Sequence, residues 1–306
     1  MEVRGAPSGV GRFTRVTDEG SRLGVRGRED LGDGLVAWFQ MEMAFPADSS
    51  SSDFKARNSG VGFEGPWGTF IAGRWDSAFN ASQTSIVDPF DDAGLPSIRG
   101  AAVNQGNFGR RNSNVVQYRS PRVPGFRTRW VYQLSEGGTG NAKPHDYSVE
   151  LSHHSPRSFL ALAYEKHIDQ AGSAVRAGSD EDGRGMGGFF HFGPVKMYGQ
   201  YGLYRRTGTE MQKSYLMGFD ATHGAHGLLG TYQNSRNGGA VSSAQPSCDL
   251  VGAGYRYRFS LRTYAIVEYA RVNNQVGALC NFGSNPVAIT AGQDLRGFAV
   301  GMRTVF

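Results

Sequence analysis

Apolar and polar residues alternate in many short segments of this chain. In residues 35–45 every odd position carries an apolar side chain, whereas the even positions include Gln40 and Glu42. Residues 147–152, 263–270 and 295–306 repeat this alternation. Because successive side chains of a β-strand point to opposite faces, each segment predicts a strand with one apolar and one polar face. Almost no segment shows the helical period of 3.6 residues.

The connections between these segments alternate in length. Short turns such as 31–34, 66–68 and 193–194 alternate with longer polar stretches. The long stretches lie at about 46–56, 80–113, 135–146, 169–185, 236–248 and 273–294. Short turns on one side and long loops on the other are typical of an outer-membrane barrel, whereas a Greek-key sandwich gives no such regularity. We therefore predict an all-β fold, an antiparallel up-and-down transmembrane β-barrel in which about fifteen strands are visible.

Composition is compatible with this fold. The 306 residues contain no linker-like stretch, so we expect a single domain over 1–306. Hydrophobic residues make up 39% and no window approaches the roughly 18 apolar residues of a membrane helix, which excludes a helical membrane protein. A mean hydropathy of −0.41 is neutral evidence, because alternation dilutes the average of a membrane strand. The 44 glycines and 12% aromatic residues suit a curved sheet with aromatic belts.

Charge and candidate chemistry favour a channel over other functions. The net charge of +5 does not indicate nucleic-acid binding, since the arginines are scattered through strand-like segments. Two cysteines are too few for a disulfide scaffold and too far apart for a zinc site, and we expect no metal or cofactor.

An enzyme is the first alternative. His153 and His154 point to opposite faces of a predicted strand, and His223 and His226 flank a predicted turn, so a catalytic triad is disfavoured. No Gly-x-Ser-x-Gly motif occurs. The glycines of 183–188 lack a following helix, which disfavours a phosphate loop.

Four segments resemble the trimeric general-diffusion porins of Gram-negative bacteria, particularly the β-proteobacterial type. They are SRLGVRGREDLGDGLVAWFQ at 21–40, NSGVGFEGPWGTFIAGRWDSAF at 58–79, VVQYRSPRVPGF at 115–126 and the terminal FAVGMRTVF. The resemblance runs from about residue 12 to the end. It implies a 16-stranded barrel, assembled as a homotrimer, whose third loop folds inward and narrows the pore opposite a cluster of arginines.

The resemblance places three arginines at this constriction, namely Arg22, Arg74 and Arg119. Arg22, Arg26 and Arg28 share one parity, opposite to Leu23 and Val25, so these three arginines are expected to line the pore. Arg74 shares its parity with Phe70, and we consider a bulge at Gly73 that would turn it inward.

The inward loop is expected at about 80–113. It offers Asp88, Asp91 and Asp92, which the resemblance places opposite the arginines. The family's common Pro-Glu-Phe-Gly-Gly stretch is absent, and Lys plus Arg number 32 against 27 acids. Because charge near the narrowest point tunes which ions pass, we predict a weak preference for anions.

Both ends of the chain carry expectations. Cys248 and Cys280 fall in long loops on the outer, oxidising side of the membrane, as either a disulfide or two free thiols. Phe298, Val300, Met302 and the terminal Phe306 match the family signal read by the barrel-assembly machinery. Residues 1–11 show neither a signal peptide nor a strand that would pair with the last one. We predict that Met1 is a misassigned start and that about fifteen strands are seen because the first is missing.

Passive passage of small hydrophilic solutes and ions across the outer membrane is therefore the predicted function, with lipid and lipopolysaccharide as surroundings. A substrate-specific channel for phosphate or dicarboxylates and a structural barrel or adhesin remain as alternatives. Conductance separates a channel from an adhesin, and solute preference separates a specific channel from general diffusion.

Overall fold

The computed structural model describes residues 2–4, 11–12, 14–48, 55–84, 86–101, 108–135, 137, 140–171, 174–208, 211–236, 247–284 and 286–306. These residues form β-strands and one short helix, α1 (Ala78–Gln83). The long strands are β3 (Arg22–Gly32), β4 (Leu35–Ala44), β6 (Ser59–Gly65), β7 (Gly68–Asp76), β8 (Arg111–Arg119), β9 (Phe126–Gln133), β10 (His145–His154), β11 (Ser158–Ile168), β14 (Glu181–Phe192), β15 (Val195–Arg206), β16 (Gln212–His223), β17 (His226–Arg236), β18 (Ser247–Arg258), β19 (Thr263–Asn274) and β20 (Asp294–Thr304). The short ones are β1 (Glu2–Arg4), β2 (Gly11–Arg12), β5 (Lys55–Ala56), β12 (Gln170–Ala171) and β13 (Ala174–Val175).

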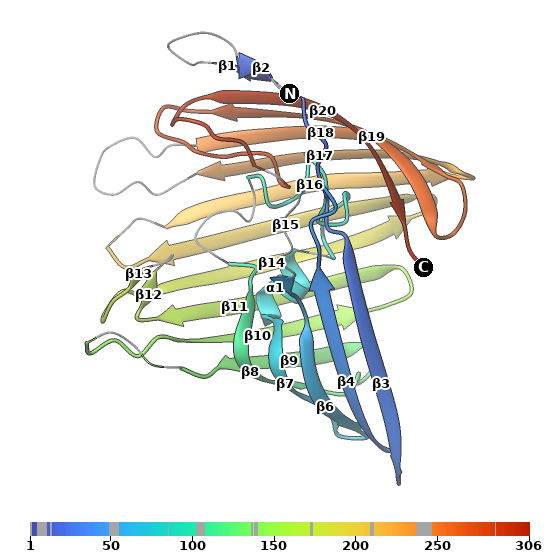
Figure 1. The fold of residues 1–306 in the computed structure, drawn as a ribbon, viewed down its shortest axis with the longest axis vertical. Helices are drawn as coiled ribbons and strands as arrows, with labels where there is room; N and C mark the ends of the chain where they lie inside the picture. The colour runs from blue at the N-terminus through green and yellow to red at the C-terminus, as the bar shows by residue number, and fades with distance from the viewer. Residues whose placement is uncertain are drawn as a thin grey trace.

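Each long strand pairs antiparallel with the next long strand along the chain, from β3 to β20. The result is one strongly curved sheet with α1 on its inner side (Figure 1). The predicted all-β antiparallel fold is confirmed. Within the described residues, β20 pairs with β19 and β1, β3 pairs with β4, and no ladder joins β3 to β20.

The start of the chain corrects one expectation. We expected no strand in residues 1–11 that would pair with the last one, but β1 pairs with β20 over three residues, from Glu2–Arg296 to Arg4–Asp294. β2 in turn pairs with β1. The last strand therefore has a partner along part of its length.

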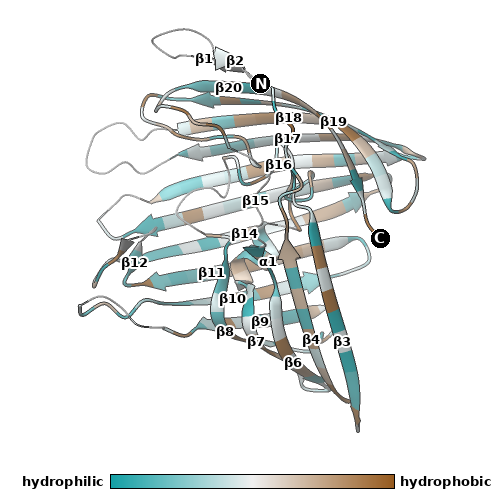
Figure 2. Cartoon of the chain, in the orientation of Figure 1, coloured by the Kyte–Doolittle hydropathy of each residue, from teal (hydrophilic) through white to brown (hydrophobic). Residues whose placement is uncertain are grey.

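The strands are apolar outside and polar inside. On β10, Leu151 is 45% exposed, whereas Ser148, Glu150 and Ser152 are buried on the opposite face. Figure 2 shows the corresponding alternation of brown and teal along the strands. This arrangement inverts that of a water-soluble domain, where large apolar residues are buried, and it suits a sheet whose outer face meets lipid.

No helix within the described ranges is long and apolar enough to cross a membrane.

The buried apolar residues lie on the inner side of the sheet, where residues 80–113 pack against it. We call this segment the inward loop; residues 85 and 102–107 of it are not described. Val87 and Ile98 of the loop are fully buried in a cluster with Leu216 of β16, and Phe79 and Phe108 pack against Tyr204 of β15. Most of the core is thus the contact that α1 and the inward loop make with the strands β8 to β20.

Candidate functional site: the inward loop and the arginine wall

A capped helix, α1, leads into the inward loop and is bound to the sheet. The Ser77 side chain caps α1 by accepting the Asn80 N–H at 3.0 Å. The Ala78 N–H donates to Ser148 Oγ of β10 at 2.9 Å. Gln83, at the other end of α1, donates to the Ala161 carbonyl of β11 at 3.2 Å. These bonds fix where the loop leaves the sheet.

Farther along the loop, one wall side chain binds its backbone directly. Gln233 of β17 is completely buried. Its amide nitrogen donates to the carbonyls of Pro96 at 2.8 Å and Ser97 at 3.1 Å, while its oxygen accepts the Ala101 N–H at 3.2 Å. A side chain that satisfies three buried backbone groups holds this part of the loop in one position.

Glycines at inward positions let the loop approach the sheet closely. A Cβ atom at Gly252 would lie 2.2 Å from Pro96 Cβ, and one at Gly218 would lie 2.4 Å from Pro89 Cγ. Gly185 and Gly187 of β14 face Gln83 in the same way. The glycine-rich stretch 183–188 is therefore a docking surface for the loop.

Asp88 does not face the pore, which corrects the predicted set of constriction residues. It is 1% exposed and accepts the backbone N–H groups of Phe90 at 2.9 Å, Asp92 at 3.1 Å and Ile98 at 2.9 Å. Burial raises the pKa of this carboxyl from 3.8 to about 7. Through these three hydrogen bonds, Asp88 holds the inward loop in its folded-back conformation.

The other two loop aspartates differ in their accessibility. Asp92 binds Arg99 through both carboxylate oxygens, at 2.6 Å to Nε and 3.0 Å to the terminal nitrogen, so its charge is neutralised within the loop. The Asp91 side chain is 54% exposed, and its nearest ion-pair partner is Arg303 at 3.9 Å. Asp91 is thus the loop aspartate most open to solvent.

The arginines of β3 lie on the inner face of the sheet. Arg26 pairs with Gln40 across the β3–β4 ladder, and Arg22 and Arg28 have the same parity as Arg26. Leu23 and Val25 are more than half exposed on the opposite face. Arg28 is 3.4 Å from Glu64 of β6, whereas Arg22 and Arg26 have no carboxylate within ion-pair distance in the described part of the chain.

Arg119 belongs to a second group of arginines on the same inner wall. It pairs directly with Arg129 of β9, and Arg127 lies within electrostatic range of both. Arg129 binds Glu150 of β10 at 3.2 Å. No ion pair joins Arg119 or Arg127 to a described carboxylate. Sequence reasoning missed Arg127 and Arg129, although their parity opposite Trp130, 56% exposed, was the signal.

Arg74 is not brought to this wall. It pairs with Ser59 across the β6–β7 ladder and shares the outward face of Phe70. Its guanidinium binds the Ala56 carbonyl and Ser113 Oγ, each at 2.9 Å. The β7–β8 register does shift near Gly73, but the extra residue is in β8, where Asn114 has a φ of 55°. The parity of β7 is therefore unchanged.

Arg57 is a further residue that the sequence reasoning missed. Its Nε lies 2.5 Å from Glu42, whose parity is that of the inward-facing Gln40. No residue spacing marked it, because Arg57 follows the very short strand β5.

Cys248 and Cys280 are joined by a disulfide, with their Cα atoms 6.2 Å apart. The bond links the start of β18 to the loop between β19 and β20. At the end of the chain, Phe298, Val300 and Met302 are each more than 60% exposed on the outward face of β20, and Phe306 is fully exposed. No group of histidine, cysteine and acidic side chains suited to a metal ion occurs in the described ranges.

Comparison with known proteins places this geometry in context. A model of the family described as Gram-negative porin matches residues 3–277. Outer membrane porin protein 32 of Delftia acidovorans is 27% identical over 303 residues, which cover 94% of this chain and 84% of that protein. The major outer membrane protein P.IA of Neisseria meningitidis is 26% identical over 278 residues, 86% of this chain and 65% of its own length.

Solved structures show the same fold. The anion-selective porin from Comamonas acidovorans has a TM-score of 0.81 at 24% identity and covers 97% of this chain, which covers 92% of it. Salmonella typhi OmpF has a TM-score of 0.72 at 14% identity, with coverages of 96% and 93%.

Proposed function

Because this chain belongs to the Gram-negative porin family and is a porin of the outer membrane, we propose a channel with a weak preference for anions. The channel passes small hydrophilic solutes and ions. It is a channel protein and not an enzyme. Solutes move down their gradients. They are sieved by the space between the inward loop and the arginines on the inner face of β3, β8 and β9, which we call the arginine wall, and their passage is biased by the charges there.

The imbalance of charge across that space carries the proposal. Arg22, Arg26, Arg119 and Arg127 lie on the inner wall without an ion-pair partner among the described residues. On the inward loop, Asp88 is buried and Asp92 is paired, which leaves Asp91. Fixed positive charge on a low-dielectric wall raises the local concentration of anions. The bias is weak because Glu42, Glu64 and Glu150 neutralise other arginines of the wall.

Reversal potentials across planar bilayers test the preference. With a KCl gradient, the reversal potential of the purified refolded protein should be shifted from zero towards the equilibrium potential of chloride. A shift towards the equilibrium potential of potassium would overturn the proposal. Liposome swelling with sugars of graded size should show uptake limited by size alone. Absence of conductance would favour the structural barrel or adhesin.

A substrate-specific anion channel is the second candidate, because Arg119, Arg127 and Arg129 lie together. Guanidinium groups in a cluster can bind a phosphate or dicarboxylate through paired hydrogen bonds. Saturation of the current with phosphate would favour this candidate, and a linear current would favour general diffusion.

A homotrimer is the proposed assembly. The supporting observations are the exposed apolar outer face and the existence of a trimer form among structural neighbours, OmpT of Vibrio cholerae, at 16% identity. We further propose that Phe298, Val300, Met302 and Phe306 engage the barrel-assembly machinery and that lipopolysaccharide surrounds the long loops. Native-mass analysis of the detergent-extracted protein tests the trimer, and a monomer would contradict it.

A further inference from the structure

The loop between β19 and β20, of which residues 275–284 and 286–293 are described, packs onto the inward loop; we call it the closing loop. Its Gly283 N–H donates to the Leu95 carbonyl at 3.0 Å, and its Ser284 N–H donates to the Gly94 carbonyl at 3.1 Å. These bonds join two backbones that are nearly 190 residues apart in the chain. Residues 94–101 of the inward loop therefore have the sheet on one side and the closing loop on the other.

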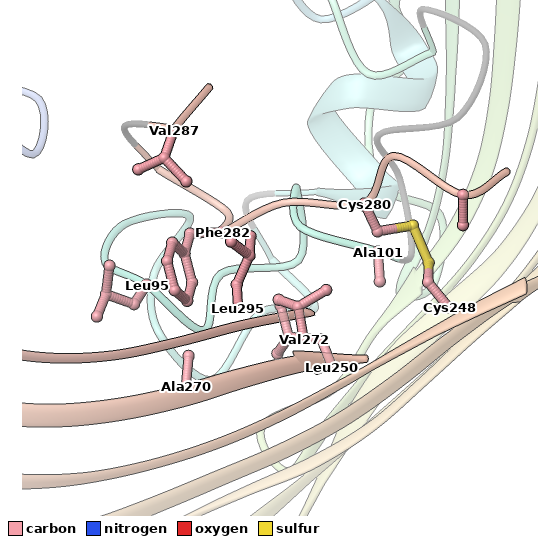
Figure 3. Packing of buried hydrophobic residues seen from close by; sticks show 11 residues of the cluster. Leu95, Ala101, Cys248, Leu250, Ala270, Val272, Cys280, Phe282, Val287 and Leu295 are labelled. Carbon is pink, nitrogen blue, oxygen red and sulfur yellow. A yellow bond between two sulfur atoms is a disulfide. The ribbon is translucent and has the colours of Figure 1, made fainter. Parts of the chain in front are cut away.

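The two loops also share a buried apolar cluster (Figure 3). Leu95 and Ala101 of the inward loop lie with Phe282 and Cys280 of the closing loop, all 5% exposed or less, over Leu250 of the sheet. A Cβ atom at Gly283 would lie 2.5 Å from Ser97 Cβ and 2.6 Å from the Ser97 oxygen. The closing loop therefore meets the backbone of the inward loop with no space between them.

Two asparagines and the disulfide hold the closing loop in this position. Asn274 binds both backbone groups of Cys280, at 2.9 Å to the oxygen and 3.0 Å to the nitrogen. Asn281 does the same for Val287, at 2.7 Å and 3.0 Å. The Cys248–Cys280 disulfide then ties the loop to β18, which removes conformations in which the loop swings away.

We infer that the closing loop is a strap that positions the inward loop, and that the Cys248–Cys280 disulfide fixes the strap and thereby the width of the constriction. The inference rests on the proposed channel function, because it assigns a second loop to the control of the same pore. Gly283 and the two cysteines are positioning residues in this assignment: they act on solutes only through the inward loop.

Two variants test the strap at different points. Gly283→Ala inserts a methyl group between strap and inward loop while leaving the disulfide in place, and Cys248→Ser with Cys280→Ser removes the disulfide. Gly199→Ala is the matched control, because a Cβ atom there meets nothing within 4 Å. In single-channel recordings, both strap variants should show severalfold more open-channel noise and closure at lower voltage. In liposome swelling, both should pass larger sugars than the wild type does. The control should match the wild type.

Hydrogen exchange gives a readout that does not depend on conduction. The amides of Gly283 and Ser284 should be protected in the wild type and lose severalfold of that protection in both strap variants. Wild-type noise, closure voltage, sugar cut-off and protection in Gly283→Ala would overturn the inference, even if the cysteine variant fails to fold. A wild-type protein that does not conduct would instead refute the proposed function, and the exchange experiment would still decide the strap.

Discussion

The two halves of the curved sheet use the same alternation for opposite purposes. From β3 to β9 the inner face carries long cationic side chains such as Arg26, Arg119 and Arg127. From β14 to β20 many inner positions are glycines, such as Gly185, Gly218, Gly252 and Gly297. The strands β3 to β9 present charge. The inner face of β14 to β20, which we call the glycine wall, lacks side chains at these positions, so the inward loop can lie against it.

This difference suggests an asymmetric pore, in line with the proposed function. We propose that the loop docked on the glycines leaves the solute path next to the arginine wall, so that solutes run along the arginines. The position of the loop sets how wide that space is, and the arginines set its charge. Changes on the two walls should therefore affect different properties of the channel.

The largest expected effect concerns pH and the folding of the inward loop. The pKa of Asp88 is raised to about 7 in the folded protein against 3.8 as its ordinary value. Between these values the folded state binds more protons than the unfolded state, so this group's contribution to stability falls as pH rises from about 4 to about 7 and is level above. The change is at most about 4 kcal/mol. Thermal unfolding of wild type and Asp88→Asn across this range checks it, since the variant should lose that slope.

The next effect tests the glycine wall. Gly252→Ala places a methyl group 2.2 Å from Pro96 Cβ and should displace the loop, at a cost of about 2 kcal/mol from overpacking. We expect a lower Tm and a larger, noisier single-channel current with unchanged ion selectivity. Gly199→Ala, on open space, is the control. An unchanged Tm and current in Gly252→Ala would show that the loop does not depend on this contact.

The arginine wall should respond in the opposite way. Arg119→Gln with Arg127→Gln removes two unpaired inner charges and should lower the anion-to-cation permeability ratio about fivefold, because the two charges together change the energy of a passing ion by about 1 kcal/mol. The Tm should change little. Arg176→Gln, in a long loop, removes one charge away from the wall and is compared with Arg119→Gln alone. A selectivity change of equal size in both would mean that only net charge matters.

The alternation of apolar and polar residues predicts the strands and the faces of their side chains, but not the contacts between distant segments. The period of two gave the strands, their order and the inward parity of Arg22, Arg26 and Arg28, because each depends only on neighbours in the chain. It could not reveal that Asp88 is buried, since that depends on the inward loop folding back to bring the Ile98 N–H to the carboxylate. From the sequence alone, a glycine on the inner face weakens the prediction of a strand. Its role is apparent only in the structure, where the inward loop occupies the space that a side chain would fill.

Arg74 and Arg119 give the sharpest test of that reasoning, with the smallest expected effect at Arg74. Both were expected at the constriction, yet Arg74 keeps the outward parity of Phe70, because the extra residue at the irregularity is in β8. Arg74→Gln should leave the reversal potential unchanged and cost about 1 kcal/mol through its lost bonds to Ala56 and Ser113. Arg119→Gln alone should shift the reversal potential towards zero. Equal shifts in the two variants would mean that Arg74 also reaches the ion path and that the assignment of faces on β7 is wrong.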